Sequence, residues 1–304
     1  MNLLFPASPL DERTPDESYA NEYEAAKSAG FAVGLINLEE LLLNDDPARA
    51  VRRIRATDEP VQAMYRGWML KPKDYERLHA ALNSRNLHLI NDPQSYKHTH
   101  HLPESYAKIA SCTPDSVWLP VAEIDSSFEA VHTAVRPFGE NPIIVKDYVK
   151  SRKHEWLEAC YIPNAADRNH VEQVVRLFLE RQGDDLNEGL VFREFAELEF
   201  LEIHERSGMP LSREMRVFVL DGRPVYVSNY WSAGQDQEFE QVLNGFLEVI
   251  ASVESRFFTI DFAKRKNGQW IVLELGDGQT AGLPDDTDEK IFYDCLYKAL
   301  SYER

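Results

Sequence analysis

The chain has 304 residues, 43% of them hydrophobic, and a formal net charge of −18 at pH 7. Its length and apolar content suffice for two or three globular domains. No apolar run reaches the roughly 18 residues of a membrane-spanning helix. The acidic balance argues against nucleic acid and anionic membranes as partners, because like charges repel. The widely spaced Cys112, Cys160 and Cys295 form no CxxC pair, which favours a reducing cytoplasm.

The first 90 residues alternate between short apolar runs and helical patterns. Strands are predicted at residues 2–6, 31–37, 61–67 and 87–91, with helices at 18–30, 38–54 and 71–86 between them. This alternation is typical of a small parallel sheet with crossover helices. We therefore expect an N-terminal α/β domain over residues 1–92.

A polar stretch, DPQSYKHTHHLPES, follows this domain and is expected to be a connector. It contains three histidines, His98, His100 and His101, which raise the question of zinc. No cysteine or acidic residue lies at ligand spacing, so the sequence disfavours a zinc site here.

The rest of the chain is expected to be α+β, with hairpins and separate helices. A strand is predicted at 141–149 with a partner at 156–163, a helix at 168–183, strands at 189–195 and 197–203, a hairpin at 213–231, a helix at 236–255, a hairpin at 259–279 and a helix at 287–304. The first hairpin turns at Asp221-Gly222, a strong signal for a two-residue turn.

The second hairpin carries the pair Asn267-Gly268, which predicts a two-residue type I′ turn. Counting outward from this turn places Arg265 opposite Trp270 and Asp261 opposite Glu274. Two opposed carboxylates repel each other, so a cation is expected between them. That cation is either a metal ion or a nearby arginine.

Lys146 interrupts the apolar strand IIVKDYV and needs an anionic partner, unless it reaches solvent from an edge strand. A cationic cluster follows it in the sequence KDYVKSRKHEW, formed by Lys150, Arg152 and Lys153. In so acidic a chain this cluster suggests a bound anion, although a solvated loop is an equal alternative.

Two further strands carry charged residues. Arg193, Glu194 and Glu197 follow the apolar run LVF, where an exposed strand end is the ordinary explanation. Arg216 lies in the middle of the first hairpin. The turn count places it opposite Val227, on the same face as Glu214 and Asn229. A salt bridge explains Arg216 as well as a phosphate contact does.

These charged features form a coherent set if the ligand is a nucleoside phosphate with a divalent cation. Mg²⁺ prefers one or two carboxylates together with substrate phosphates. Lysine and arginine side chains would hold those phosphates and stabilise developing charge.

The order of these elements resembles the ATP-grasp superfamily over the whole chain. The resemblance implies an α/β N-terminal domain followed by an α+β ATP-grasp fold, whose two subdomains sandwich ATP. The corresponding ranges are 1–92 for the N-terminal domain, 93–188 for the first ATP-grasp subdomain and 189–304 for the subdomain with the metal site.

The resemblance also implies roles for individual residues. IIVKDYV is similar to the family's strand whose lysine contacts the α and β phosphates, which makes Lys146 that lysine. LVFREFAELE resembles the strand that binds adenine and ribose, with Glu194 and Phe195 near adenine and Glu197 at the ribose. Further implied residues are Arg216 on the phosphate side as the catalytic arginine, Asp261 and Glu274 as metal ligands, and the loop residues Lys150, Arg152 and Lys153 over the phosphates.

Two departures from the family pattern stand out. The family commonly has a glycine-rich loop after the lysine strand, whereas VKSRKHEW contains no glycine. An asparagine usually follows the metal-binding glutamate by two residues, and that position is Gly276. Asp277 or Gln279 is a candidate substitute. Lys97 and Lys108 are candidates, by region only, for the second ATP-binding lysine.

The resemblance implies an ATP- and Mg²⁺-dependent ligase (Mn²⁺ is an alternative ion). It would join a carboxylate to an amine through an acyl phosphate, and its substrate would be a small molecule such as an amino acid, or a peptide. The alternatives are a phosphotransferase of the same fold and a nucleotide-binding module without catalysis. Arg66, in MYRGWML, is a candidate clamp for a substrate carboxylate. An ordinary strand end is the competing explanation for it.

Overall fold

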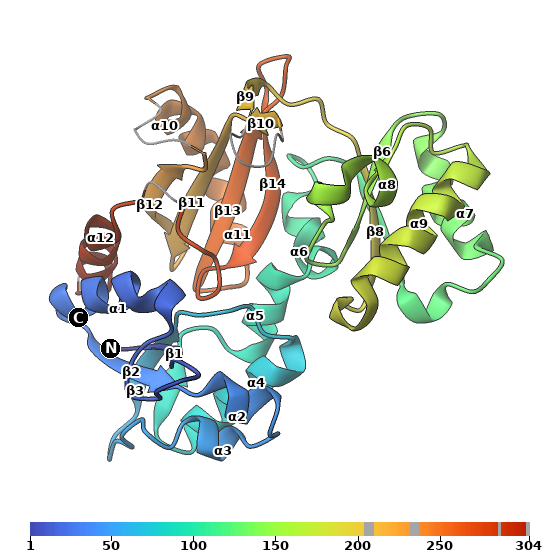
Figure 1. Cartoon of the computed structure of the whole chain (residues 1–304). Coiled ribbons are helices and arrows are strands. Elements are labelled where there is room, and N and C mark those ends of the chain that lie inside the picture. Colours follow the sequence, from blue (N-terminus) through green and yellow to red (C-terminus); the bar gives the residue numbers. More distant parts are fainter. Residues whose placement is uncertain (204–209, 232–236, 285–286, 302–304) are drawn as a thin grey trace. The chain divides into compact units, whose positions relative to one another are not determined.

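The computed structural model describes residues 1–203, 210–231, 237–284 and 287–301 (Figure 1). The chain separates into two compact units. The first comprises Met1–Thr99, Met215–Ile260 and Leu275–Arg304, and the second comprises His100–Glu214 and Asp261–Glu274. Each unit thus combines segments that are distant in sequence. The consecutive boundaries 1–92, 93–188 and 189–304 stay a prediction.

The first unit begins with a four-stranded parallel sheet in the order β2-β1-β3-β4. Its strands are β1 (Asn2–Pro6), β2 (Ala32–Ile36), β3 (Val61–Tyr65) and β4 (Leu87–Leu89), and its helices are α1 (Ala20–Ser28), α2 (Leu38–Leu42), α3 (Pro47–Ala50) and α4 (Pro72–Asn83). The predicted parallel sheet with crossover helices is confirmed. The predicted helix over 38–54 is two short helices, because Asp46 caps a new helix start at Pro47.

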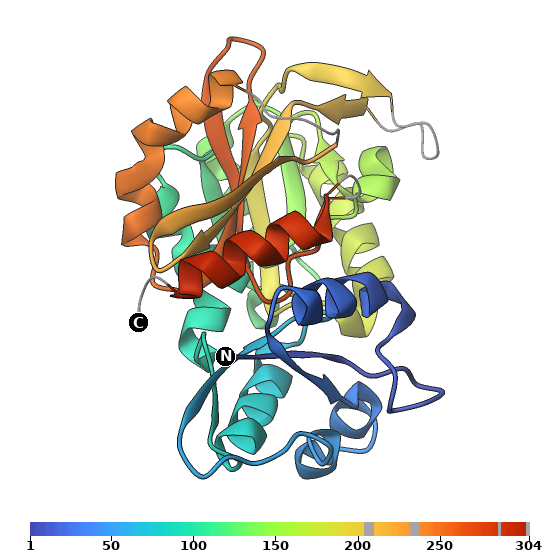
Figure 2. The same cartoon turned by 90° about the vertical axis from the view of Figure 1, so that its left-hand side faces the viewer.

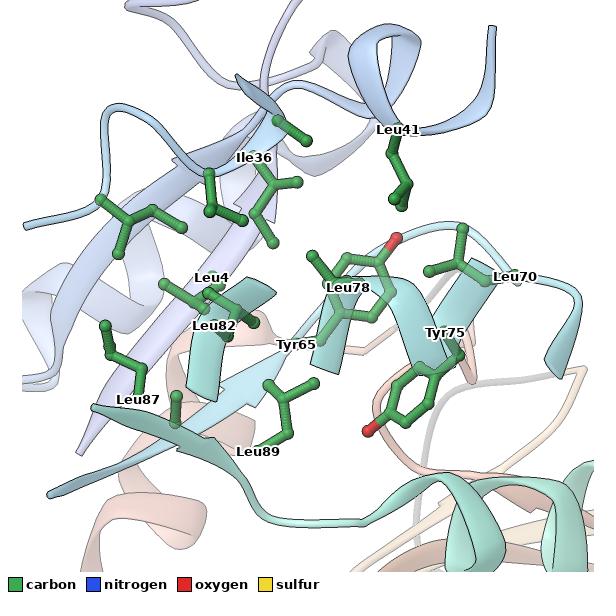
Figure 3. Close-up of a cluster of buried hydrophobic side chains, with 14 of the residues drawn as sticks. Leu4, Ile36, Leu41, Tyr65, Leu70, Tyr75, Leu78, Leu82, Leu87 and Leu89 are labelled. Atoms are coloured by element: carbon green, nitrogen blue, oxygen red, sulfur yellow. The ribbon is translucent and has the colours of Figure 1, made fainter. Parts of the chain in front are cut away.

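Both faces of this sheet are buried, since successive strand residues point to opposite faces. On one face, Leu4 of β1 packs in a cluster with Leu78 and Leu82 of α4 (Figure 3). On the other face, Leu3 and Phe5 belong to a second cluster, whose C-terminal members are Phe292, Tyr293 and Leu296. These three residues lie on α12 (Glu289–Ser301), which runs beside α1 (Figure 2). The N-terminal sheet therefore shares its core with the C-terminal helix.

A second sheet has the order β12-β11-β13-β14. Its strands are β11 (Glu214–Leu220), β12 (Arg223–Asn229), β13 (Phe257–Lys264) and β14 (Trp270–Asp277). The helices before β13 are α10 (Gln237–Leu243) and α11 (Leu247–Ser252), separated by a 3-10 turn at Asn244–Phe246. The predicted continuous helix over 236–255 is thus interrupted, and its first residue lies outside the described residues.

The hairpin of β11 and β12 turns at Asp221-Gly222, with φ values of 47° and 75°. Two positive φ values confirm the two-residue turn. The register then shifts between Phe218 and Val219. Because of this bulge, Arg216 pairs with Ser228, so the predicted pairing of Arg216 with Val227 is wrong by one residue. Likewise, Asn229 pairs with Met215 instead of Glu214.

The turn between β13 and β14 differs from the type I′ prediction. Gly268 N–H donates to Arg265 O at 2.8 Å, and Arg265 N–H donates to Gln269 O at 2.8 Å. Gly268 has a φ of 88°, whereas Asn267 is not among the residues with positive φ. This is a three-residue loop closed by a glycine bulge. Arg265 therefore pairs with Gln269, and its predicted pairing with Trp270 is wrong.

A second irregularity lies toward the far end of this hairpin. There, Gly278 N–H donates to Phe257 O at 3.1 Å. Between the turn and this pair, β13 has eight steps and β14 has nine, so β14 contains one extra residue. Counted inward from Gly278, Asp261 again falls opposite Glu274. That pairing stays a prediction.

The second unit contains an antiparallel sheet in the order β5-β8-β6-β7 (Figure 1). Its strands are β5 (Ser116–Pro120), β6 (Ile143–Asp147), β7 (Tyr161–Ile162) and β8 (Gly189–Glu194), and the accompanying helices are α7 (Glu129–Val135), α8 (Trp156–Ala159) and α9 (Arg168–Gln182). Of the partner strand predicted at 156–163, only β7 pairs with β6. The helix predicted at 168–183 is confirmed as α9, which ends before Gly183.

Two other predictions in this part of the chain are corrected. The expected connector forms two helices, α5 (Pro93–His100) and α6 (Leu102–Ile109). Asp92 accepts a hydrogen bond from Ser95 N–H at 2.7 Å, so Asp92-Pro93 was a helix-start signal. The strand β9 (Phe200–Ile203) pairs with β10 (Pro210–Ser212), but its four residues are exposed rather than half-buried.

The remaining short elements are 3-10 turns at Glu17–Tyr19, Val121–Glu123, Arg136–Phe138, Lys153–Glu155 and Gly183–Asp185. None of the helices in the described residues is both long and apolar enough to cross a membrane.

Candidate functional site

The two faces of the β5-β8-β6-β7 sheet differ in chemistry. One face carries Ile143 and Val145 of β6 and Phe192 of β8, which are fully buried in a cluster with α7 and α9 (Figure 1). The opposite face carries Lys146 of β6 and Arg193 of β8. The register pairs Lys146 with Val191 and Arg193 with Ile144, so the two cations are diagonal neighbours. The second face is thus the polar one.

Lys146 has the anionic partner that its position demanded. Its Nζ donates to Glu274 Oε2 at 3.3 Å. The lysine side chain is only 7% exposed, whereas the glutamate side chain is 43% exposed. A buried ammonium next to a half-exposed carboxylate leaves one side of the pair open to a ligand. The structure thus brings together the predicted phosphate lysine and one predicted metal ligand.

Arg193 is a second buried cation on this face, 5% exposed. It donates to Leu273 O and Val272 O of β14 and to Thr113 Oγ1. Burial lowers the pKa of Arg193 to about 10, and Glu274 opposes this effect. The sequence treated Arg193 as a strand-end residue and gave it no role. The register next to Lys146 was the missing information.

His100 is buried close to the same charges. Burial lowers its pKa to about 3, and the neighbouring His101, Lys150 and Lys146 act in the same direction. His100 is therefore neutral at physiological pH. His101 is fully buried, and its ring lies 5.9 Å from that of Tyr148. The histidines of the former connector are thus buried helix residues, and whether they bind zinc stays a prediction.

The loop after β6 carries the predicted phosphate-binding cations. Lys150 and Lys153 are exposed. Arg152 donates to Glu155, to Arg181 O at 3.1 Å and to Gln182 Oε1 at 3.1 Å. Its guanidinium therefore ties the loop to α9. A role for any of these three residues in ATP binding stays a prediction.

The predicted adenine and ribose residues follow β8. Phe195 is part of an aromatic group, with ring centroids 5.1 Å from Tyr161 and 6.0 Å from Trp156. Glu194 lies 3.5 Å from the guanidinium of Arg265.

Glu197 is exposed and lies 3.2 Å from the Nζ of Lys266. Its backbone O also accepts from Lys266 N–H at 3.0 Å, so this segment lies along the β13–β14 turn. The adenine and ribose contacts stay predictions.

Asp261, the other predicted metal ligand, is 4% exposed and lies on β13. The described residues contain no group of three or more His, Cys, Asp or Glu side chains that could hold a metal ion. A divalent ion bound by Asp261 and Glu274 would therefore need further oxygens from its substrate, which suits Mg²⁺ with a nucleoside phosphate.

Arg216, the predicted catalytic arginine, lies in the first unit. Its guanidinium carbon is 4.6 Å from the ring centroid of Tyr230, and its Nη1 donates to Gly282 O at 2.8 Å. The aromatic face and the carbonyl fix the direction of the guanidinium. Its catalytic role stays a prediction.

Arg66 is not the surface clamp that the sequence suggested. The residue is 1% exposed, and its Nη1 donates to Gly278 O at 2.7 Å and Ala281 O at 2.8 Å. Its Nη2 and Nε donate to Glu22 Oε2, the Nη2 contact at 2.6 Å. Each nitrogen thus serves the protein interior, and the prediction of a substrate contact is corrected to a structural role.

Asp277 and Gln279 also serve the interior of the first unit. Asp277 accepts from Asn91 Nδ2 at 2.5 Å and from Gln279 N–H at 3.0 Å. The side-chain amide of Gln279 donates to Tyr75 Oη at 2.7 Å and accepts from Tyr65 N–H at 3.0 Å. Their polar atoms are thus engaged, which contradicts the prediction that one of them is a third metal ligand.

The two candidate ATP lysines chosen by region can also be located. Lys97 lies on α5 and Lys108 in the last turn of α6. Their role stays a prediction.

Comparisons with known proteins agree on one fold. A family model described as an ATP-grasp domain, the third family of one clade of that superfamily, matches residues 137–296. Among solved structures, D-cycloserine synthetase DcsG is similar, with 13% identity and a TM-score of 0.59 over 99% of this chain and 100% of that one. The ATP-grasp ligase PsnB complexed with a minimal precursor has 12% identity and a TM-score of 0.56 over 99% of both chains.

D-alanine–D-alanine ligase from Bacillus anthracis, complexed with ATP, has 12% identity and a TM-score of 0.55 over 100% of this chain and 98% of that one. No protein of curated function matches the sequence. At these identities the structural likeness shows the fold alone.

Proposed function

Because the chain belongs to the ATP-grasp superfamily, within the family whose domain model matches residues 137–296, we propose that it is an ATP-dependent ligase joining a carboxylate to an amine. The observation that carries the proposal is the contact between buried Lys146 and Glu274, 3.3 Å apart on the polar face of the sheet. A ligase of this kind needs a cation for phosphate and a carboxylate for a metal ion, side by side. The pair supplies both.

ATP would replace the contact within the pair by two contacts with the nucleotide. The Nζ of Lys146 would donate to phosphate oxygens, and Arg193 would keep the local field positive on the neighbouring strand. Glu274 and Asp261 would hold Mg²⁺, which neutralises phosphate charge when bound.

The chemical steps would be two displacements. A carboxylate oxygen of the first substrate forms a bond to the γ-phosphorus while the bond between that phosphorus and the ADP oxygen breaks. The amine nitrogen of the second substrate then bonds to the acyl carbon, releases inorganic phosphate and loses a proton. No protein nucleophile is needed, so the chain has only to bind, orient and exclude water. Arg216 is proposed to stabilise the charge that develops at the phosphoryl or acyl oxygens.

The adenine would bind near the end of β8. The group of Trp156, Tyr161 and Phe195 provides aromatic surface next to a stretch of non-strand backbone. In the described structure, no hydrogen bond involves the backbone N–H or C=O of Ala196, directly after Phe195. One donor and one acceptor on the main chain suit the edge of a purine. Glu194 and Glu197 are proposed to lie near adenine and ribose respectively.

The substrates are proposed to be an amino acid or peptide carboxylate and an amine. PsnB is a ligase in complex with a precursor peptide, and D-alanine–D-alanine ligase is named for amino acids. These names describe those proteins, and they set the compounds to be screened first. A phosphotransferase that stops after the first displacement is the second candidate function, because the same residues would serve it.

The test begins with binding. Saturating ATP and Mg²⁺ should stabilise the native protein by RT ln(1 + [L]/Kd), about 2.7 kcal/mol at 100 times Kd. Lys146→Ala should lose most of this effect, whereas Lys27→Ala, an exposed lysine of the first unit, should keep it. A thermal shift that is absent in the wild type, or unchanged in Lys146→Ala, would contradict the proposal.

Activity is then measured as ADP release with pools of amino acids and peptides. A ligase requires both a carboxylate and an amine for stoichiometric ADP and phosphate release. A phosphotransferase would release ADP with one substrate and leave the phosphoryl group on it. Phosphorus NMR of the products separates these two outcomes.

A further inference from the structure

Asp147 follows Lys146 directly and has an unusual environment for a carboxylate. It is 0% exposed. Its Oδ1 accepts from the backbone N–H groups of Val149 and Lys150, the first at 2.7 Å. Its Oδ2 accepts from Gln182 Nε2 at 3.2 Å and from Asn187, through N–H at 3.2 Å and Nδ2 at 2.8 Å. All five donors are neutral. In the part of the chain that the structure describes, Asp147 has no ion pair.

A buried carboxylate without a counter-ion is costly unless several N–H groups point at it. Two successive backbone N–H groups aimed at one anion form a nest, which proteins commonly use to bind phosphate. Here the anion in the nest is a side chain of the same loop. The N–H groups of Val149 and Lys150 are therefore occupied before any ligand arrives.

The rest of the loop is fixed around this carboxylate. Asp147 N–H donates to Lys150 O at 2.9 Å, which closes the turn. Tyr148 O accepts from Leu102 N–H at 2.9 Å, and Arg152 is tied to α9 through Gln182. The loop thus reaches a defined shape without the glycines that would let the backbone approach a phosphate.

We infer that Asp147 is a positioning residue that occupies the anion nest of this loop, so that phosphates are bound by lysine side chains instead of backbone N–H groups. This inference rests on the proposed function. Lys150 and Lys153 are exposed on the fixed loop, and Lys146 lies at its start. Phosphate binding by ammonium groups is governed by charge, so it should weaken with salt more than a backbone cradle does.

Amide hydrogen exchange tests the occupied nest directly. In the ATP-free protein, the amides of Val149 and Lys150 should already be protected, and saturating ATP with Mg²⁺ should leave their exchange rates within about twofold. In Asp147→Ala both amides should exchange at least about tenfold faster. Asp185→Ala removes an exposed acid nearby and should change neither. ATP-induced protection of these two amides in the wild type would overturn the inference.

Calorimetric titration with ATP and Mg²⁺ tests the lysine half. The double variant Lys150→Gln/Lys153→Gln should bind at least about tenfold more weakly and with a shallower salt dependence, and Lys150→Arg/Lys153→Arg should recover most of the affinity. Unchanged affinity in the glutamine variant would refute this half.

Failure of the proposed function looks different. It is a wild-type protein that does not bind ATP at all, while the exchange rates without ATP still decide whether Asp147 occupies the nest. If Asp147→Ala does not fold, the wild-type exchange measured with and without ATP decides the same question.

Discussion

Glu274 has two roles that oppose each other. It neutralises the buried Lys146, and it is proposed to hold a metal ion. Glu274→Gln should therefore destabilise the ATP-free protein by about 1–2 kcal/mol. This lies between the roughly 0–1 kcal/mol of exposed pairs and the 3–5 kcal/mol of buried ones, because the glutamate is half-exposed. Chemical denaturation measures this difference.

The control for this experiment is Lys146→Met/Glu274→Gln, which removes both charges. If the pair is coupled, the double variant should be more stable than the sum of the single effects predicts. It should nevertheless fail to bind ATP. Additive effects would show that the two side chains do not depend on each other.

Asp277 makes a pH-dependent contribution to stability in the first unit. Burial raises its pKa to about 7, while hydrogen bonds from Asn91 and Gln279 oppose this. Since the folded pKa lies above the unfolded value, the native state holds the proton more tightly, and stability from this group falls as pH rises from about 4 to about 7. Relative to wild type, Asp277→Asn should gain unfolding free energy across that window, by up to about 4 kcal/mol. The difference should be flat above pH 8.

Unfolding by urea at pH 4.5, 6 and 8 is the measurement, and the comparison of the two proteins cancels titrations that they share. A difference that stays constant across the three pH values would mean that Asp277 ionises normally.

At the level of elements, the β13–β14 turn shows where a sequence signal was ambiguous. Asn-Gly is compatible with a two-residue turn, but here only Gly268 has positive φ. Asn267 instead accepts a hydrogen bond from Gln269 N–H at 3.0 Å. A local sequence pattern cannot decide between turns that differ by one residue, since the choice depends on how the strands pair beyond it.

Gly268→Ala should cost about 1–2 kcal/mol, because an alanine is strained at a φ of 88° even though open space surrounds the position. Gly245→Ala is a matched control: its surroundings are equally open, its φ is not in the positive range, and it should be neutral or slightly stabilising. Equal effects of the two substitutions, measured by thermal unfolding, would argue against the glycine bulge.

Much of the fold could be predicted because its elements follow strong local patterns. The parallel sheet was visible as alternating apolar runs and helices, and α9 as an apolar stripe ended by Gly183. The lysine on β6 was identified as functional because its apolar neighbours made it incongruous. Arg66 was misjudged because burial and the contact with Glu22 are tertiary facts that sequence spacing does not contain. Asp147 was missed for the same reason.

At the scale of the whole molecule, the first unit is held together by residues from both ends of the chain. Tyr293 Oη donates to Glu22 Oε2 at 2.6 Å, and Phe292 packs in the same cluster as Leu3 and Phe5. A fragment of residues 1–99 should therefore not fold alone, because one face of its sheet would be exposed. Amide NMR dispersion of the fragment is the measurement. A dispersed spectrum with cooperative melting would show that the N-terminal sheet is autonomous.

The shared core has a consequence for the order of events during synthesis. β1 through β4 leave the ribosome well before α12 exists, and about 200 residues of translation, on the order of 10–40 s, separate Ile90 from Phe292. Throughout that interval the growing chain carries an unfinished apolar surface, which invites chaperone binding or aggregation. Ribosome-bound chains arrested before residue 289 should thus be cleaved by protease within the N-terminal sheet, and chains extended so that α12 has emerged should resist.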